Sequence, residues 1–137
     1  MKSKLALFLA TVLFLPILGL EVAHAQSDHT VKADIPFDFY AGTQKLPAGT
    51  YSLRFDIGNN NVQITDDARH GMFLMSTDIN EGKDSNPALL FDHSGDNYFL
   101  KTIETSDVDI NFSVTKAEKK LASNASATPV VVAVNLH

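Results

Sequence analysis

The sequence contains no cysteine and no tryptophan. The absence of cysteine excludes disulfide bonds, thiol nucleophiles, cysteine metal ligands and lipid attachment through a cysteine. Stability must therefore come from a packed core. Basic residues are also few, with 11 Lys and Arg against 16 Asp and Glu and a formal net charge of −5. Because an acidic surface repels phosphate backbones, and no basic stripe with interleaved aromatic residues occurs, we expect no nucleic-acid partner.

Long hydrophobic runs are missing except at the N-terminus. Lys2 and Lys4 precede an apolar segment from Leu5 to Leu20, and Ala23-His24-Ala25 has the small-x-small form of a cleavage site. A transmembrane anchor is the competing interpretation, but the run is shorter than the roughly 20 residues that a spanning helix needs. The sequence therefore predicts a signal peptide over residues 1–25.

The segment after this signal, residues 26–137, has the length of one ordinary domain. A signal peptide implies export, so we expect this domain in the periplasm or outside the cell. Its expected partner is a protein or another component of the cell envelope of unknown identity. Contact with the membrane is expected only through the cleaved signal peptide.

The strongest structural pattern lies in the first third of this domain. Apolar residues alternate with other residues on both sides of a turn, at Val31, Ala33, Ile35, Phe37 and Phe39 and then at Tyr51, Leu53, Phe55 and Ile57. This two-residue period is typical of strands with one buried face. Gly42, Pro47 and Gly49 supply turn chemistry between the two runs. The pattern predicts a strand–turn–strand unit that seeds the core.

Similar patterns predict seven strands, over residues 31–40, 49–57, 61–65, 72–75, 88–91, 98–103 and 108–114. Pro36 cannot donate a backbone hydrogen bond, so we expect the first strand to lie at an edge or to carry a bulge. Residues 72–75 are apolar on both faces and are interpreted as a more buried strand. The polar segment 80–87 is predicted to be a mobile surface loop.

The C-terminal region combines a short helix with a last strand. Thr115 and Glu118 have the spacing of a capping box, which predicts a helix near residues 116–122. Residues 123–129 have the composition of a linker, and residues 130–135 are β-branched enough to form a last strand. This last strand either pairs within the domain, which we favour, or remains exposed and self-associates.

Many short strands separated by turns favour an all-β fold. We predict a single-domain antiparallel β-sandwich or small barrel of about seven to eight strands with one short C-terminal helix. A sandwich is the first choice.

Four motifs together resemble a family of small exported bacterial β-proteins whose function is uncharacterised. They are I-P-F-x-F at Ile35–Phe39, L-P-A-G-T-Y at Leu46–Tyr51, G-D-x-Y-F-L at Gly95–Leu100 and A-E-K-x-L at Ala117–Leu121. The resemblance covers roughly residues 33–122 and brings no catalytic or binding residues with it. Members of this family tend to have a tryptophan after the Y-F-L strand and Leu-Pro before the A-E-K segment. This chain has no tryptophan and reads Ile110-Asn-Phe-Ser-Val114 there.

Asp92, His93 and Ser94, with Asp96 nearby, place carboxylates, an imidazole and a hydroxyl in one short stretch. Adjacent residues rarely form a catalytic triad, because the three groups must converge in space rather than in sequence. No G-x-S-x-G motif is present. We therefore interpret the stretch as a hairpin turn in which Gly95 adopts a positive φ, and we predict that the protein is not an enzyme. A small hydrolase is the third hypothesis for its function.

The same hairpin supplies the candidate binding residues, which are Asp92, His93, Asp96, Asn97 and Tyr98. Oxygen ligands suited to calcium also occur over residues 56–61, but neither stretch has the spacing of a known calcium loop. His70 and His93 on separate turns lack zinc-ligand spacing. We therefore predict no metal and no cofactor. The carboxylate pairs at 66–67 and 107–109 are interpreted as polar strand faces rather than glycosidase acids.

These observations favour a non-enzymatic exported β-domain that acts as an interaction or structural module of unknown molecular function. A carbohydrate or small-molecule binding module is the second hypothesis, with aromatic residues such as Tyr98 as a stacking surface. A small outer-membrane β-barrel is a further alternative. The predicted strands are mostly shorter than the about 9–11 residues of membrane strands.

Overall fold

The computed structural model describes residues 29–83, 86–122 and 126–136. The predicted signal peptide lies outside the described residues, as does part of the predicted linker. The strands are β1 (His29–Ile35), β2 (Phe39–Ala41), β3 (Gln44–Leu46), β4 (Gly49–Asp56), β5 (Asn61–Asp66), β6 (Gly71–Met75), β7 (Asp78–Glu81), β8 (Ala88–Ser94), β9 (Asn97–Glu104), β10 (Val108–Asn111), β11 (Thr128–Ala133) and β12 (Asn135–Leu136). A 3-10 turn, η1 (Ile57–Asn59), and a helix, α1 (Lys116–Leu121), complete the described elements.

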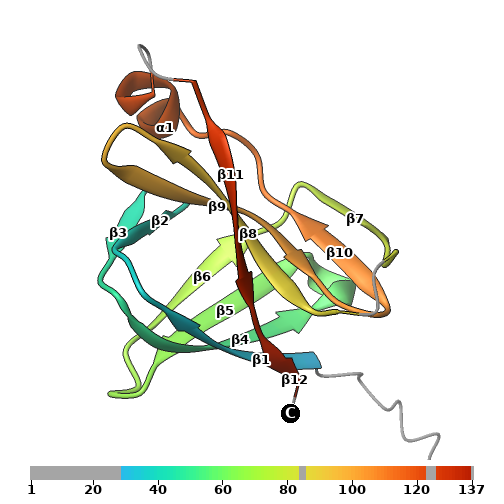
Figure 1. The fold of residues 1–137 in the computed structure, drawn as a ribbon. Coiled ribbons are helices and arrows are strands. Elements are labelled where there is room, and N and C mark those ends of the chain that lie inside the picture. The colour runs from blue at the N-terminus through green and yellow to red at the C-terminus, as the bar shows by residue number, and fades with distance from the viewer. Residues whose placement is uncertain (1–28, 84–85, 123–125, 137) are drawn as a thin grey trace, which may run out of the picture.

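The strands form two sheets that pack face to face (Figure 1). One sheet has the order β12-β1-β4-β5-β6, and the other has the order β11-β8-β9-β10-β7. The small β2–β3 hairpin joins the second sheet through a parallel pairing of Tyr40 with Phe99. The other pairings between strands are antiparallel. The predicted all-β sandwich is therefore confirmed.

The chain joins the two sheets along both sides of the sandwich. On one side β6 runs into β7 through Ser76 and Thr77, whose backbone N–H groups donate to Asn60 O and Asn111 O, both at 2.9 Å. On the other side β11 runs into β12 through the buried Val134. Strands that change sheets in this way form the corners of such sandwiches. Each sheet thus ends at a strand that continues into the other sheet.

The core follows from the alternation of apolar residues in the sequence. In β1 and β4 every second side chain is buried. Phe91 of β8 lies at the centre of an aromatic group, in edge-to-face contact with Phe37 at 5.2 Å and with Phe39 at 5.5 Å between ring centroids. The fully buried large side chains come from both sheets and include Phe39, Leu53, Phe55, Ile64, Leu89, Phe91, Ile103 and Ile110.

Two predictions about the first strand are wrong. The predicted strand over 31–40 is two strands, because β1 ends at Ile35 and β2 begins at Phe39. Pro36 lies just beyond β1, where its missing N–H removes no bond from the ladder. The expectation of an edge position or a bulge is also wrong, since β1 lies between β4 and β12 and its register with β4 is unbroken.

Several other boundaries differ from the prediction. Asn80 and Glu81 belong to β7 rather than to a loop, and β7 pairs with β10. This strand is polar and mostly exposed, so its sequence has little of the apolar alternation that marks a strand. β3 was likewise missed, because it lies within a stretch of turn residues. The strand predicted over 108–114 ends at Asn111.

The C-terminal predictions are largely confirmed. The Glu118 N–H donates to Thr115 Oγ1 at 3.0 Å, and the Thr115 N–H donates to Glu118 Oε2 at 3.4 Å, so the capping box is present. The last strand pairs within the chain, as β11 with β8 and as β12 with β1. It begins earlier than predicted, because Thr128 and Pro129 belong to β11 rather than to the linker. No helix in the described ranges is long and apolar enough to cross a membrane.

Candidate functional site

The predicted site residues lie on the β8–β9 hairpin. β8 continues to Ser94 and β9 begins at Asn97, so the turn consists only of Gly95 and Asp96. Gly95 has a φ of 62°, the left-handed value that the turn interpretation requires. Asp92 and His93 are therefore strand residues, and the prediction of a six-residue turn is wrong.

The strand geometry separates the groups that a triad would need. Successive side chains of a strand point to opposite faces of the sheet, so His93 lies on the other face from Asp92 and Ser94. Ser94 is only 1% exposed. These groups do not converge on a point that a substrate could reach.

His93 and Tyr98 are the two predicted site residues that the hairpin brings together. They are cross-strand partners, and their rings stack at 4.2 Å with an interplanar angle of 11°. Tyr98 also stacks on Phe37 at 3.8 Å and 16°. Phe37 in turn packs on the core residue Phe91. The three stacked rings thus continue the hydrophobic core along the hairpin, while Asp96 lies exposed in the turn.

The candidate metal ligands have local structural roles. Asp56 caps η1 by accepting a hydrogen bond from the Asn59 N–H at 3.3 Å. Asp66 accepts one from the His70 N–H at 2.7 Å, and this bond is the main reason that the pKa of Asp66 is lowered. The His70 ring lies beside Asp66 in the turn before β6, whereas the His93 ring stacks on Tyr98 in the second sheet, so each has a local role. Within the part of the chain that the structure describes, no group of three His, Cys, Asp or Glu could hold a metal ion.

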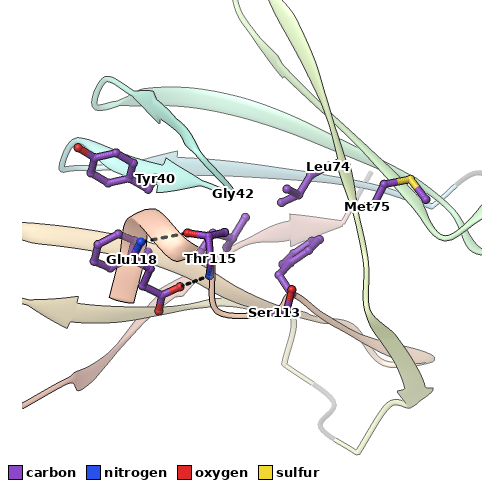
Figure 2. A pocket seen from close by; sticks show the side chains of 10 residues that line it. Tyr40, Gly42, Leu74, Met75, Ser113, Thr115 and Glu118 are labelled. Atoms are coloured by element: carbon purple, nitrogen blue, oxygen red, sulfur yellow. Dashed lines mark hydrogen bonds between the residues drawn. The ribbon is translucent and has the colours of Figure 1, made fainter. Parts of the chain in front are cut away.

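A hollow of about 60 Å³ lies between β6, the β2–β3 hairpin and the start of α1 (Figure 2). Leu74 points toward Gly42, and the missing Cβ of Gly42 leaves room for this approach, because a Cβ there would lie 2.9 Å from Leu74 Cδ1. Glu118 also lines the hollow, with Lys101 Nζ 3.3 Å from its Oε1 atom. This volume admits water, whereas organic ligands usually occupy about 300–1,000 Å³.

A larger depression of about 540 Å³ lies over β7, β9 and β10. It is open, and its lining is polar, with Asn80, Glu81, Lys83, Thr102, Glu104, Asp109 and Asn111. Small-molecule sites are mostly concave and apolar with a few polar groups, so this surface is a poor match to them. The predicted carboxylate Asp109 lies here, but its predicted partner Asp107 does not line the depression.

β6 carries an exposed apolar surface that the sequence did not predict. Phe73 and Met75 are each 66% exposed, although residues 72–75 were predicted to form a more buried strand. That prediction is wrong, because exposed and half-buried residues alternate along β6. The sequence has apolar residues on both faces of this strand. That pattern cannot show that one face is left exposed in the folded protein.

The backbone of β6 is also open on one side. The Asp66 N–H donates to His70 O, and the Ser76 N–H donates to Asn60 O, at the two ends of the β5–β6 pairing. Residue pairs along an antiparallel ladder alternate between hydrogen-bonded and non-hydrogen-bonded. The backbone groups of Met72 and Leu74 are therefore the ones that bond to β5. Gly71, Phe73 and Met75 direct their N–H and C=O groups away from β5, and no backbone bond to them from another described strand is present. We call these three residues the β6 edge.

A second row of backbone groups that face away from the neighbouring strand lies on β11. The Val134 N–H donates to Pro87 O at 3.2 Å, so the residues that bond to β8 are Thr128, Val130 and Val132. Pro129, Val131 and Ala133 face away from β8, and we call them the β11 edge. Val131 is 64% exposed, whereas Pro129 has no N–H to offer.

Comparisons with protein-family models, with curated proteins and with solved structures find no match to this chain. The resemblance to a family of exported bacterial β-proteins therefore stays a prediction.

Proposed function

We propose that this chain is a non-enzymatic exported domain that acts as an interaction module, and that it binds an extended segment of a protein chain along the β6 edge. One observation carries the proposal. The β6 edge combines unpaired backbone groups with two large apolar side chains that are each 66% exposed. Export is proposed on the features of residues 1–25 alone.

An open strand edge is a template for another strand. The outward N–H and C=O groups of an edge strand pair with the backbone of an added strand, and alternate side chains supply specificity. Natural edge strands are often protected by charge, by proline or by a bulge. β6 has the sequence Gly-Met-Phe-Leu-Met, which contains no charge and no proline, and this favours a surface made for binding.

The positions of the candidate chemical groups support a module over an enzyme. The acidic, imidazole and hydroxyl groups of the β8–β9 hairpin lie on opposite faces of the sheet. His93 and Tyr98 pack against one another and toward the core. Surface recognition by β6 needs none of these groups, so it does not conflict with their structural roles.

The proposal is tested by placing a photo-crosslinking amino acid at position 73 in cells that export the chain. The matched control carries the same amino acid at position 131, where Val131 is almost equally exposed on the β11 edge. We expect discrete protein adducts from position 73 and none from position 131. No adduct from position 73, or the same adducts from both positions, would overturn the proposal.

A further inference from the structure

We propose that the segment bound at the β6 edge is β6 of a second copy of this chain, paired antiparallel about a two-fold axis beside Phe73. This inference rests on the proposed function, because it names the occupant of the same surface. Its support comes from the register, from the side chains that such a pairing would bring together and from the absence of charge on β6.

Only some registers bring the outward-facing backbone groups of two β6 strands opposite one another. Gly71, Phe73 and Met75 direct their backbone groups outward, so these residues must face one another across the axis. Centring the axis on Phe73 places Phe73 opposite its own copy and Gly71 opposite Met75 of the second copy. Every outward N–H and C=O of the β6 edge then meets a partner. A two-fold arrangement of this kind is closed, so it ends at a dimer.

The side chains on the exposed face are complementary in this register. Gly71 has no side chain, and it lies opposite the large Met75 of the second copy. The two Phe73 rings become direct neighbours, and cross-strand aromatic pairs stabilise sheets. The exposed apolar side chains of each copy thus cover those of the other.

The absence of charge on β6 is compatible with a second copy as its partner. The whole chain carries a formal net charge of −5, so two copies repel one another over most of their surface. β6 itself has no charged residue, so pairing two copies of this strand brings no like charges of β6 against one another.

The size of the contact sets its strength. The paired strands are only five residues long, so the interface is expected to bury less than the standard range of about 1,200–2,000 Å². Contacts of this size are usually transient. We therefore expect a monomer–dimer equilibrium that shifts with concentration rather than a permanent dimer.

The absence of cysteine makes the register directly testable. Cα atoms of a bonded antiparallel pair are about 5.5 Å apart, which suits a disulfide. We expect Phe73→Cys to form a disulfide-linked dimer under mild oxidation of the purified exported chain. Met75→Cys is the matched control, because Met75 is equally exposed but its two copies would be about 13 Å apart along the strands. Equal cross-linking of the two variants, or none from Phe73→Cys, would overturn the register.

Sedimentation velocity tests the dimer without any cross-link. The unmodified chain and Val131→Lys should move from monomer to dimer as concentration rises, whereas Phe73→Lys should remain monomeric at the same concentrations. A monomer at every concentration for all three proteins overturns the proposed dimer. In that case an adduct of position 73 with a different protein would still support the interaction module, so the two proposals can fail separately.

Discussion

The β6 edge and the β11 edge are two solutions to the same structural problem. Both belong to outer strands without charged residues, and both strands continue into the opposite sheet. The outward row of β11 contains Pro129, which cannot donate a hydrogen bond to an added strand. The outward row of β6 contains Gly71, Phe73 and Met75, and each of these can both donate and accept. One residue type in the outward row therefore distinguishes a protected edge from an open one.

The two sides also differ at the corner where the strand changes sheets. On the β11 side, Val134 is buried between the sheets with 9% of its surface exposed. On the β6 side, the hollow of about 60 Å³ separates Leu74 and Met75 from Ser113 and Thr115 (Figure 2). The side that is tightly packed is the side with the protected edge. This difference teaches that the opening at β6 is local, since the corner at Val134 on the other side of the same fold is packed.

The largest effect is expected from the core that both sides share. Phe91→Ala should lower the free energy of unfolding by about 3–5 kcal/mol, because Phe91 is 1% exposed and contacts two other rings. Phe73→Ala is the matched control, and it should change this free energy by less than about 0.5 kcal/mol because Phe73 lies on the surface. Urea denaturation measures both values. Equal losses would show that Phe73 is packed into the domain and not available to a partner.

The next effect concerns the packed corner on the β11 side. Val134→Ala removes two buried methyl groups and should destabilise the protein by about 1.5–2.5 kcal/mol. Val131→Ala removes the same atoms from the exposed β11 edge and should have little effect. Denaturation midpoints of the two variants give the comparison directly. A small loss of stability in Val134→Ala would mean that this corner is no better packed than the one at β6.

A third effect concerns the helix beside the hollow on the β6 side. Thr115→Ala removes the oxygen that accepts the Glu118 N–H and should cost about 1 kcal/mol of stability. Thr115→Ser keeps the hydroxyl and serves as the control. Thermal unfolding followed by circular dichroism measures the difference. The same loss in both variants would indicate that the methyl group, rather than the cap, stabilises this region.

A fourth prediction concerns a substitution that removes the proline from the β11 edge. Pro129→Val restores an outward N–H and should make β11 resemble β6, with a change in unfolding free energy of no more than about 1 kcal/mol. We expect stronger concentration-dependent association by sedimentation velocity than in the unmodified chain. Pro129→Val combined with Phe73→Lys should retain this added association. An unchanged sedimentation profile would show that proline is not what protects β11.

The smallest effect lies in the turn before β6 and depends on pH. The His70 N–H bonded to Asp66 holds the pKa of this carboxyl below its usual value of 3.8. A carboxyl whose pKa is lowered by folding stabilises the protein fully above its unfolded pKa, and this contribution is lost as pH falls through the folded pKa. The stability difference between the unmodified chain and Asp66→Asn should therefore shrink below about pH 4. Melting temperatures over this range measure it, with Asp67→Asn expected to follow the unmodified chain.

Several parts of the fold were predictable because they depend on nearby residues. The alternation in β1 and β4 revealed the buried face of each strand, and the Thr115–Glu118 spacing revealed the start of α1. The hairpin at Gly95 was also recognisable as a turn. The extent of this turn was misjudged, since the strands continue to Ser94 and from Asn97 and thereby place Asp92 and His93 on opposite faces.

The sequence by itself determined the strand character of most segments, the turns and the helix cap, because these follow from local backbone preferences and from side chains a few residues apart. Only the tertiary structure decided that β6 has a neighbour on one side and none among the described strands on the other. It also decided that β11 pairs with β8 while its continuation, β12, pairs with β1. These outcomes depend on contacts between residues far apart in the chain. An apolar strand has the same local sequence pattern whether its outer face is covered or open.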